Sequence, residues 1–280
     1  MITWIAYCFL GWIFLNLVRR YRVGSFAPLF LCGAVFGWVG EGVVVDTLYG
    51  HPSSPFPLSI SFTGLAWHAL LSVGVGWYLT GRALTEEKPT RIALVSLAVG
   101  AGWGLWAVWW PAELGKGVDA SVWGFAKHSL ACSIPFLVSW VVLGMARPDW
   151  FQAGKVTAFV LWGLVLAIFL AARVPARPTA ALILPPLLLL CWVGLRHNAS
   201  TEHRPDLLDG LLGQIRPRNV IALILIPLAA IAVYGVLRSL NRHLPTNVVL
   251  YVITMPLGFV FFLWSLWVVF RSARDRSTSP

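Results

Sequence analysis

The chain has 280 residues, of which 58% are apolar and only 11% are charged, whereas charged residues make up roughly 25% of an ordinary soluble protein. Its net charge is +10, but Lys and Arg stand in short breaks between apolar runs and do not gather on one surface. This composition excludes a soluble globular enzyme, a disordered chain and a nucleic-acid-binding domain.

Apolar runs along the chain predict its fold class. A membrane-crossing helix needs about 20 apolar residues. We therefore predict an all-α, polytopic integral membrane protein of about nine transmembrane helices, a multi-pass protein of a bacterial or archaeal cell membrane. The predicted helices cover residues 2–18, 24–46, 58–80, 91–110, 121–145, 156–173, 179–195, 219–237 and 247–270.

The distribution of cations predicts the orientation. If the N-terminus is outside, 15 of the 21 Lys and Arg residues fall in cytoplasmic segments and six on the outer side. Because cytoplasmic loops carry the excess of Lys and Arg, we expect the N-terminus outside and the C-terminus inside.

Small residues recur at four-residue intervals in four predicted helices. One line is Gly100–Gly104, and the other three each contain one ionisable residue: Gly33–Gly37–Glu41, Gly64–His68–Ser72–Gly76 and Gly124–His128–Cys132. Since membrane helices pack through small residues and hydrogen bonds, these lines are expected to face protein. At a rise of 1.5 Å per residue, Glu41, His128 and His68 lie roughly 7, 10 and 15 Å below the outer ends of their helices.

The first half of the chain, residues 1–146, is therefore predicted to hold helices 1–5 and an outward-facing polar pocket. The second half, residues 147–280, contains no Asp, Glu or His inside a predicted span and is expected to be an apolar scaffold. Leucines spaced along the loop between its helices predict an interfacial helix near residues 205–216.

Glu41, His68 and His128 are the predicted catalytic residues, because ionisable groups inside a membrane are costly and usually functional. One carboxylate and two imidazoles suit acid–base catalysis. They also suit a divalent metal with Glu41, His68 and His128 as ligands, or, less well, haem held by the two histidines. The alternative is that the polar residues only hold helices together.

Aromatic and acidic residues near the outer rim are predicted to bind substrate. Trp67 directly precedes His68, and Trp106 and Trp110 lie in the fourth predicted helix. Glu113 follows that helix, and Asp46 ends the second one. The expected partners are membrane lipid and an amphiphilic small molecule, without nucleic acid. The sequence does not indicate the oligomeric state.

The order Glu41, His68, His128 distantly resembles the CPBP family of intramembrane proteases, which includes the CAAX prenyl endopeptidases. That family has a Glu-Glu pair followed by Arg, then FxxxH, then HxxxN on successive helices. The chain departs from the pattern at Gly40 and Gly42 beside Glu41, at Val45 for the arginine, at Gly64 for the phenylalanine and at Cys132 for the asparagine. We do not assign membership on this resemblance.

Three functions remain open at this point. The first is a membrane-embedded enzyme acting on an isoprenoid, a lipid or a lipidated peptide by Glu/His acid–base or metal-assisted chemistry. The second is a small-solute or proton-coupled transporter, and the third is a non-catalytic membrane subunit or sensor.

The orientation is directly testable on a background without native cysteines. A cysteine introduced at Pro52 is expected to react with a membrane-impermeant maleimide from outside the cell. One introduced at Glu86 should react only after the membrane is opened. The reverse labelling pattern would overturn the predicted orientation.

Overall fold

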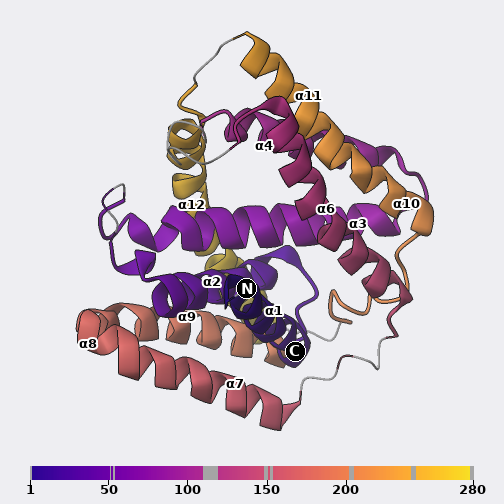
Figure 1. Ribbon diagram of the computed structural model, residues 1–280. Helices are drawn as coiled ribbons and strands as arrows, with labels where there is room; N and C mark the ends of the chain where they lie inside the picture. The colour runs from indigo at the N-terminus through magenta and orange to yellow at the C-terminus, as the bar shows by residue number, and fades with distance from the viewer. Residues whose placement is uncertain are drawn as a thin grey trace. The chain divides into compact units, whose positions relative to one another are not determined.

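The structure is a computed structural model, and it describes residues 2–50, 52, 54–109, 119–147, 151, 154–201, 205–240 and 244–277 (Figure 1). Throughout these described ranges the regular elements are helices, without a strand. The predicted all-α fold is therefore confirmed for this part of the chain.

Eight helices of the described residues are long and apolar enough to cross a membrane. They cover Phe26–Val45, Ile60–Thr85, Thr90–Ala107, Val122–Met145, Lys155–Ala176, Ala180–Ala199, Pro217–Ser239 and Thr246–Arg271. Each of them matches one of the last eight predicted spans. The chain thus has the architecture of a multi-pass membrane protein. The first predicted span coincides with helix α1 (Ile2–Arg20), which is not among these eight, so a total of nine crossings stays a prediction.

The chain forms two compact units that do not follow its order. Unit 1 comprises Met1–Tyr78, Asp149–Asp209 and Ile253–Pro280, and unit 2 comprises Leu79–Pro148 and Gly210–Val252. The functional division at residue 146 stays a prediction.

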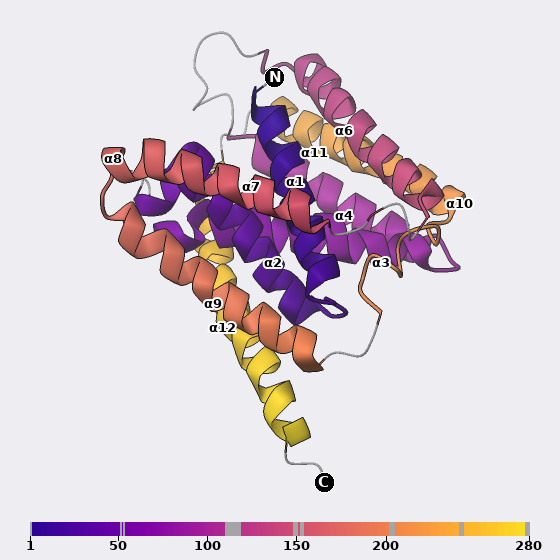
Figure 2. The same ribbon diagram turned by 90° about the horizontal axis from the view of Figure 1, so that it is seen from below.

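Unit 1 is built around the helix of the second predicted span. Its elements are α1, α2 (Phe26–Val39), η1 (Gly40–Val45), η2 (Thr47–Tyr49), η3 (Ile60–Leu79) up to Tyr78, α7 (Lys155–Ile168), η4 (Phe169–Arg173), α8 (Val174–Ala176), α9 (Ala180–Thr201) and α12 (Thr246–Ser277) from Ile253. Helix α1 packs against α2 and α7, and α2 also packs against α9 (Figure 2).

Helices α2 and η3 cross with their backbones in contact. A Cβ atom at Gly37 would overlap the carbonyl oxygen of Gly64, and one at Gly33 would lie 3.0 Å from the Cα of Ala69. The Trp38 indole N–H donates to the carbonyl of Ile60 at 2.9 Å. Residues further along α2 contact residues earlier in η3, so the two helices run antiparallel. The prediction that the glycine lines face protein is confirmed for Gly33, Gly37, Gly64 and His68, whereas Ser72 on the second line is exposed.

In unit 2, two helices also cross with their backbones in contact at glycines. Its elements are α3 (Thr80–Thr85), α4 (Thr90–Ala107), α6 (Val122–Met145), α10 (Pro217–Ile221), η5 (Ala222–Ile224) and α11 (Leu225–Ser239). A Cβ at Gly100 or Gly104 of α4 would overlap a backbone carbonyl of α11. Helix α6 packs on α11 through stacked Phe125 and Tyr234 rings, whose centroids are 4.3 Å apart.

The line Gly124–His128–Cys132 does not follow the prediction. His128 and Cys132 are exposed, whereas Phe125, Ser129 and Ser133, one position further along the helix, are buried. The neighbouring line faces protein because Phe125 supplies the large ring that stacks on Tyr234. Spacing of small residues alone therefore misassigned this helix face.

The predicted interfacial helix near residues 205–216 is also wrong. This segment forms a series of turns. The Asp206 carboxylate accepts from the backbone N–H groups of Leu208 and Asp209, and the N–H of Leu207 donates to Val23. Its leucines face protein, with Leu208 1% exposed. Local capping and burial replace the helix that the leucine spacing predicts.

The Gly37–Gly64 crossing makes a stability prediction. Gly37→Ala should destabilise the protein by about 1–3 kcal/mol, because the added methyl group meets backbone and the helices must separate. Gly163→Ala is a matched control, since an added Cβ there has no heavy atom within 4 Å. Thermal unfolding of both variants in detergent measures the difference. Equal melting temperatures would show that the crossing is not tight.

Candidate functional site

Glu41 lies where the winding of its helix changes. Helix α2 ends at Val39, and residues Gly40–Val45 continue as the wider π-helix η1. Asp46 then adopts a left-handed conformation with φ of 89°, and its N–H donates to the carbonyl of Glu41 at 2.9 Å. Single π-turns of this kind are rare and often lie at functional sites.

Glu41 and His68 form a buried pair. His68 Nε2 lies 2.8 Å from Glu41 Oε1, and the two residues are only 7% and 9% exposed. Side chains of a helix lean toward its N-terminus. Since α2 and η3 run antiparallel and each residue follows the glycine of the crossing, both side chains lean back toward the Gly37–Gly64 contact and meet beside it.

Two threonines complete the hydrogen bonding of the carboxylate. The Thr47 hydroxyl donates to Glu41 Oε2, and the Thr63 hydroxyl lies 3.4 Å from that of Thr47. Both oxygens of Glu41 therefore have partners. An ionised carboxylate only accepts hydrogen bonds, so in that state His68 Nε2 carries the hydrogen and donates it.

Aromatic rings surround the imidazole. Phe36 meets the His68 ring edge-to-face with centroids 5.4 Å apart, and Tyr7 of α1 lies at 6.0 Å. Phe36 and Tyr7 also contact each other. Tyr7 is 46% exposed, so it is the most exposed member of this group.

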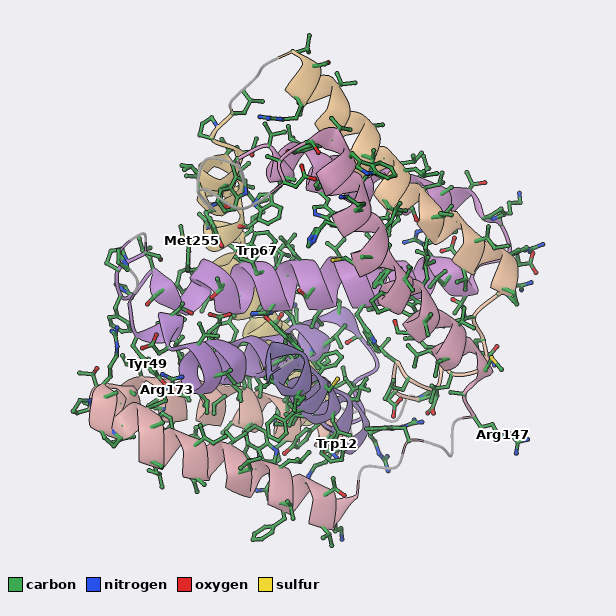
Figure 3. All side chains as sticks on the ribbon, viewed as in Figure 1. Trp12, Tyr49, Trp67, Arg147, Arg173 and Met255 are labelled. Atoms are coloured by element: carbon green, nitrogen blue, oxygen red, sulfur yellow. The ribbon has the colours of Figure 1, made fainter. Side chains whose placement is uncertain are left out.

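The end of the irregular helix is held by polar groups outside the predicted pocket. Tyr49 donates its hydroxyl to the carbonyl of Gly42 at 2.6 Å, and burial raises the pKa of this phenol above its ordinary value. Arg173 donates to the carbonyls of Val43 and Val44. Tyr49 and Arg173 lie at the same end of the unit (Figure 3). These bonds supply partners to carbonyls of the last helical turn, where the helix itself provides none.

The predicted rim residues have separate surroundings. Asp46 faces two cations, Arg173 at 3.9 Å and Arg177 at 3.5 Å. Trp67 is half-buried on η3, next to His68 in the chain. Trp106 belongs to unit 2 and donates its indole N–H to Asn247 at 3.0 Å. Trp110 and Glu113 lie outside the described residues.

His128 is not part of the pair. It lies on α6 in unit 2, with Nε2 3.6 Å from the Cys132 sulfur. Within the described residues no group of three or more His, Cys, Asp or Glu side chains is arranged to hold a metal ion. Glu41 and His68 thus have no third protein ligand there, and His68 and His128 are not shown to share a haem.

Several residues of the site escaped the sequence analysis: Tyr7, Thr47, Thr63 and Arg173. Thr63 and His68 are five residues apart, which places them on different faces of an α-helix. The i→i+5 bonding of η3 brings them toward one face. Thr47 approaches Glu41 only because the chain reverses at Asp46. The change of winding carried no sequence signal beyond the glycines around Glu41.

The chain was compared with protein-family models, curated proteins and solved structures, and none of them matches it. The site is therefore interpreted from its own geometry.

The Glu41–His68 bond predicts energetic coupling. The destabilisations caused by Glu41→Gln and His68→Gln should fail to add, with a coupling energy of about 0.6–1.7 kcal/mol, the range found for hydrogen bonds between membrane helices. Ser72→Ala on η3 is the control, because the exposed Ser72 hydroxyl donates to the carbonyl of Trp67 on its own helix at 3.0 Å. Its effect should add to that of Glu41→Gln. Unfolding titrations in mixed micelles measure the cycle, and full additivity of the Glu41 and His68 variants would contradict the pair.

Proposed function

We propose that the protein is an enzyme of a bacterial or archaeal cell membrane, with its N-terminus outside, in which Glu41 and His68 form an acid–base pair acting on an amphiphile. An isoprenoid, a lipid or a lipidated peptide fits this description. The observation that carries the proposal is the 2.8 Å contact between the imidazole and the carboxylate in a buried, largely apolar setting.

The pair has the parts of a general base. An ionised Glu41 that accepts from Nε2–H fixes the tautomer of His68 and leaves a lone pair on Nδ1, which can accept a proton from a reacting group. The carboxylate then stabilises the imidazolium that forms. Thr47 holds the second carboxylate oxygen, so Glu41 stays oriented toward the ring.

The surroundings of the pair favour a substrate that arrives through lipid. Phe36 and Tyr7 flank the imidazole, and Val44 and Val45 at the end of η1 are 41% and 51% exposed. An apolar approach of this kind suits the tail of an amphiphile. We retain Asp46 and Trp67, which lie in the same unit, as substrate-binding candidates. Trp106, Trp110, Glu113 and His128 remain predictions from the sequence.

Acid–base chemistry is preferred to metal-assisted chemistry for this pair. Glu41 already has a hydrogen-bond partner on each oxygen, and one nitrogen of His68 is bound to Glu41. A divalent metal would have to replace these bonds and find further ligands beyond the groups that the described residues bring together.

A proton-coupled transporter is the second candidate, and the irregular helices favour it. Both members of the pair lie on π-wound segments, η1 and η3. Transporters commonly place their ion and substrate sites at interruptions of membrane helices. In that case His68 and Glu41 would bind and release a proton during transport, without chemistry on a substrate.

Turnover in defined membranes tests the proposed function. Purified protein in nanodiscs is incubated with a total lipid extract, a polyprenyl phosphate or a farnesylated peptide, and products are identified by mass spectrometry. Wild type and Ser72→Ala should form the same product. Glu41→Gln and His68→Gln should lower its rate by about 10²–10⁴-fold, the usual contribution of general acid–base catalysis.

Other outcomes separate the candidates. Full turnover by both pair variants would contradict the acid–base assignment. If none of the probes reacts, but proteoliposomes carry protons with wild type and not with Glu41→Gln, the transporter is favoured. Coupling in the mutant cycle, with neither turnover nor proton transport detected in wild type, would indicate that the pair only holds helices together.

A further inference from the structure

Unit 1 contains a second feature that the pair does not use. A cavity of about 710 Å³ lies among α1, α2, α7 and α9, a volume within the range of about 300–1,000 Å³ that is typical of ligand sites. Neither Glu41 nor His68 lines it. Figure 2 shows α7 beside α1 and α9 beside α2. We call this cavity the α1–α7–α9 groove.

The walls of the groove are apolar and open to the surface. Phe159 and Trp162 come from α7, and Leu188, Leu189 and Trp192 from α9. Phe159 is 80% exposed. In a membrane this side faces lipid, so a bound acyl chain would remain continuous with the bilayer.

One end of the groove is cationic. Arg20 in the last turn of α1 and Lys155 at the first position of α7 both line it, and both are exposed. Within the part of the chain that the structure describes, neither forms an ion pair. Neighbouring Arg19 differs, because Asp206 and Asp209 bind it. The Asn198 amide also donates to the carbonyl of Tyr21 at 2.9 Å, which fixes the end of α9 beside the end of α1.

A buried amide lies one turn inside this cationic end. Asn16 lines the groove and is only 2% exposed, and its Nδ2 has no hydrogen-bond partner among the described residues. Four residues separate it from Arg20, about 6 Å along the helix. A buried donor without a partner is costly. This donor therefore indicates that an acceptor from outside the chain completes the site.

We propose that the α1–α7–α9 groove binds one anionic diacyl phospholipid from the leaflet beside the arginine-rich loops. The phosphate lies between Arg20 and Lys155, which pair with it by charge-assisted hydrogen bonds. Asn16 donates to an ester carbonyl, which in such a lipid lies just inside the phosphate. One acyl chain runs along Phe159, Trp162 and Leu188.

The dimensions and the charge agree with this occupant. Lys155 and Trp162 are seven residues apart, so the apolar wall extends roughly 10 Å inward from the cationic end. By the excess of cations, this end belongs to the predicted cytoplasmic side, where basic pockets between helices bind anionic headgroups. The inference is independent of the function proposed for Glu41 and His68.

Native mass spectrometry of protein released from nanodiscs tests the groove. The nanodiscs contain phosphatidylcholine and phosphatidylglycerol, and the retained lipids are counted. Wild type should keep one phosphatidylglycerol. Arg20→Gln combined with Lys155→Gln should lower its retention at least tenfold. Asn16→Leu should lower it about 3- to 10-fold, the loss expected for one hydrogen bond.

A charge-matched control separates this site from general attraction to anionic lipid. Lys88→Gln combined with Arg147→Gln removes two exposed cations that do not line the groove and should retain lipid like wild type. Melting temperatures in lipid-free detergent confirm that each variant is folded.

Four results would overturn the inference. Equal retention by all variants would show that these residues do not bind lipid, and equal loss in both double variants would show non-specific attraction. Displacement of the lipid by inorganic phosphate, or equal retention of phosphatidylcholine, would show that the groove does not select an anionic lipid.

Discussion

The close approach of α2 and η3 at Gly37 and Gly64 is the constraint on which the candidate site depends. No side chain separates the two backbones there, and a methyl group on Gly37 would overlap the carbonyl of Gly64. Glu41 and His68 follow these glycines on antiparallel helices, so their side chains meet beside the crossing at 2.8 Å. A wider separation would leave a carboxylate and an imidazole without each other in an apolar environment, at considerable cost.

The same rule, that polar groups in lipid need partners, organises the rest of unit 1. The irregular end of α2 exposes carbonyls, and Tyr49 and Arg173 satisfy them. Arg19 is bound by Asp206 and Asp209. The Asn16 amide and the Ser265 hydroxyl depart from the rule among the described residues, and Asn16 lies where the groove gathers two cations. The pair is proposed as a site because its hydrogen bonding is complete. The groove is proposed as a site because one of its buried donors lacks an acceptor.

Much of this arrangement follows from the sequence. Runs of apolar residues locate, to within a few residues, the eight described helices that are long and apolar enough to cross a membrane, because length and hydropathy suffice for this. The glycine lines of the second and third spans identify their contact face, and with it Glu41 and His68. The threonine partners were not predictable from the sequence. Thr63 comes to the same helix face as His68 only because η3 is π-wound, and Thr47 reaches Glu41 only because the chain reverses at Asp46. The prediction for His128 was wrong because the spacing of small residues takes no account of Phe125, whose ring stacks on Tyr234. The prediction for residues 205–216 was wrong because the spacing of leucines takes no account of the backbone N–H groups that bind Asp206.

The central claim is that Glu41 and His68 act as one hydrogen-bonded pair, in which the ionised carboxylate stabilises the imidazolium of His68, and infrared difference spectroscopy across a pH titration tests it most directly. In protein with isotope-labelled histidine, the account predicts that a carboxyl band and a histidine ring band change together. In Glu41→Gln the carboxyl change should be lost and the histidine ring band should be altered, whereas Ser72→Ala should keep both changes. A carboxyl band that changes without any histidine band, or a histidine band unaffected by Glu41→Gln, would contradict the account.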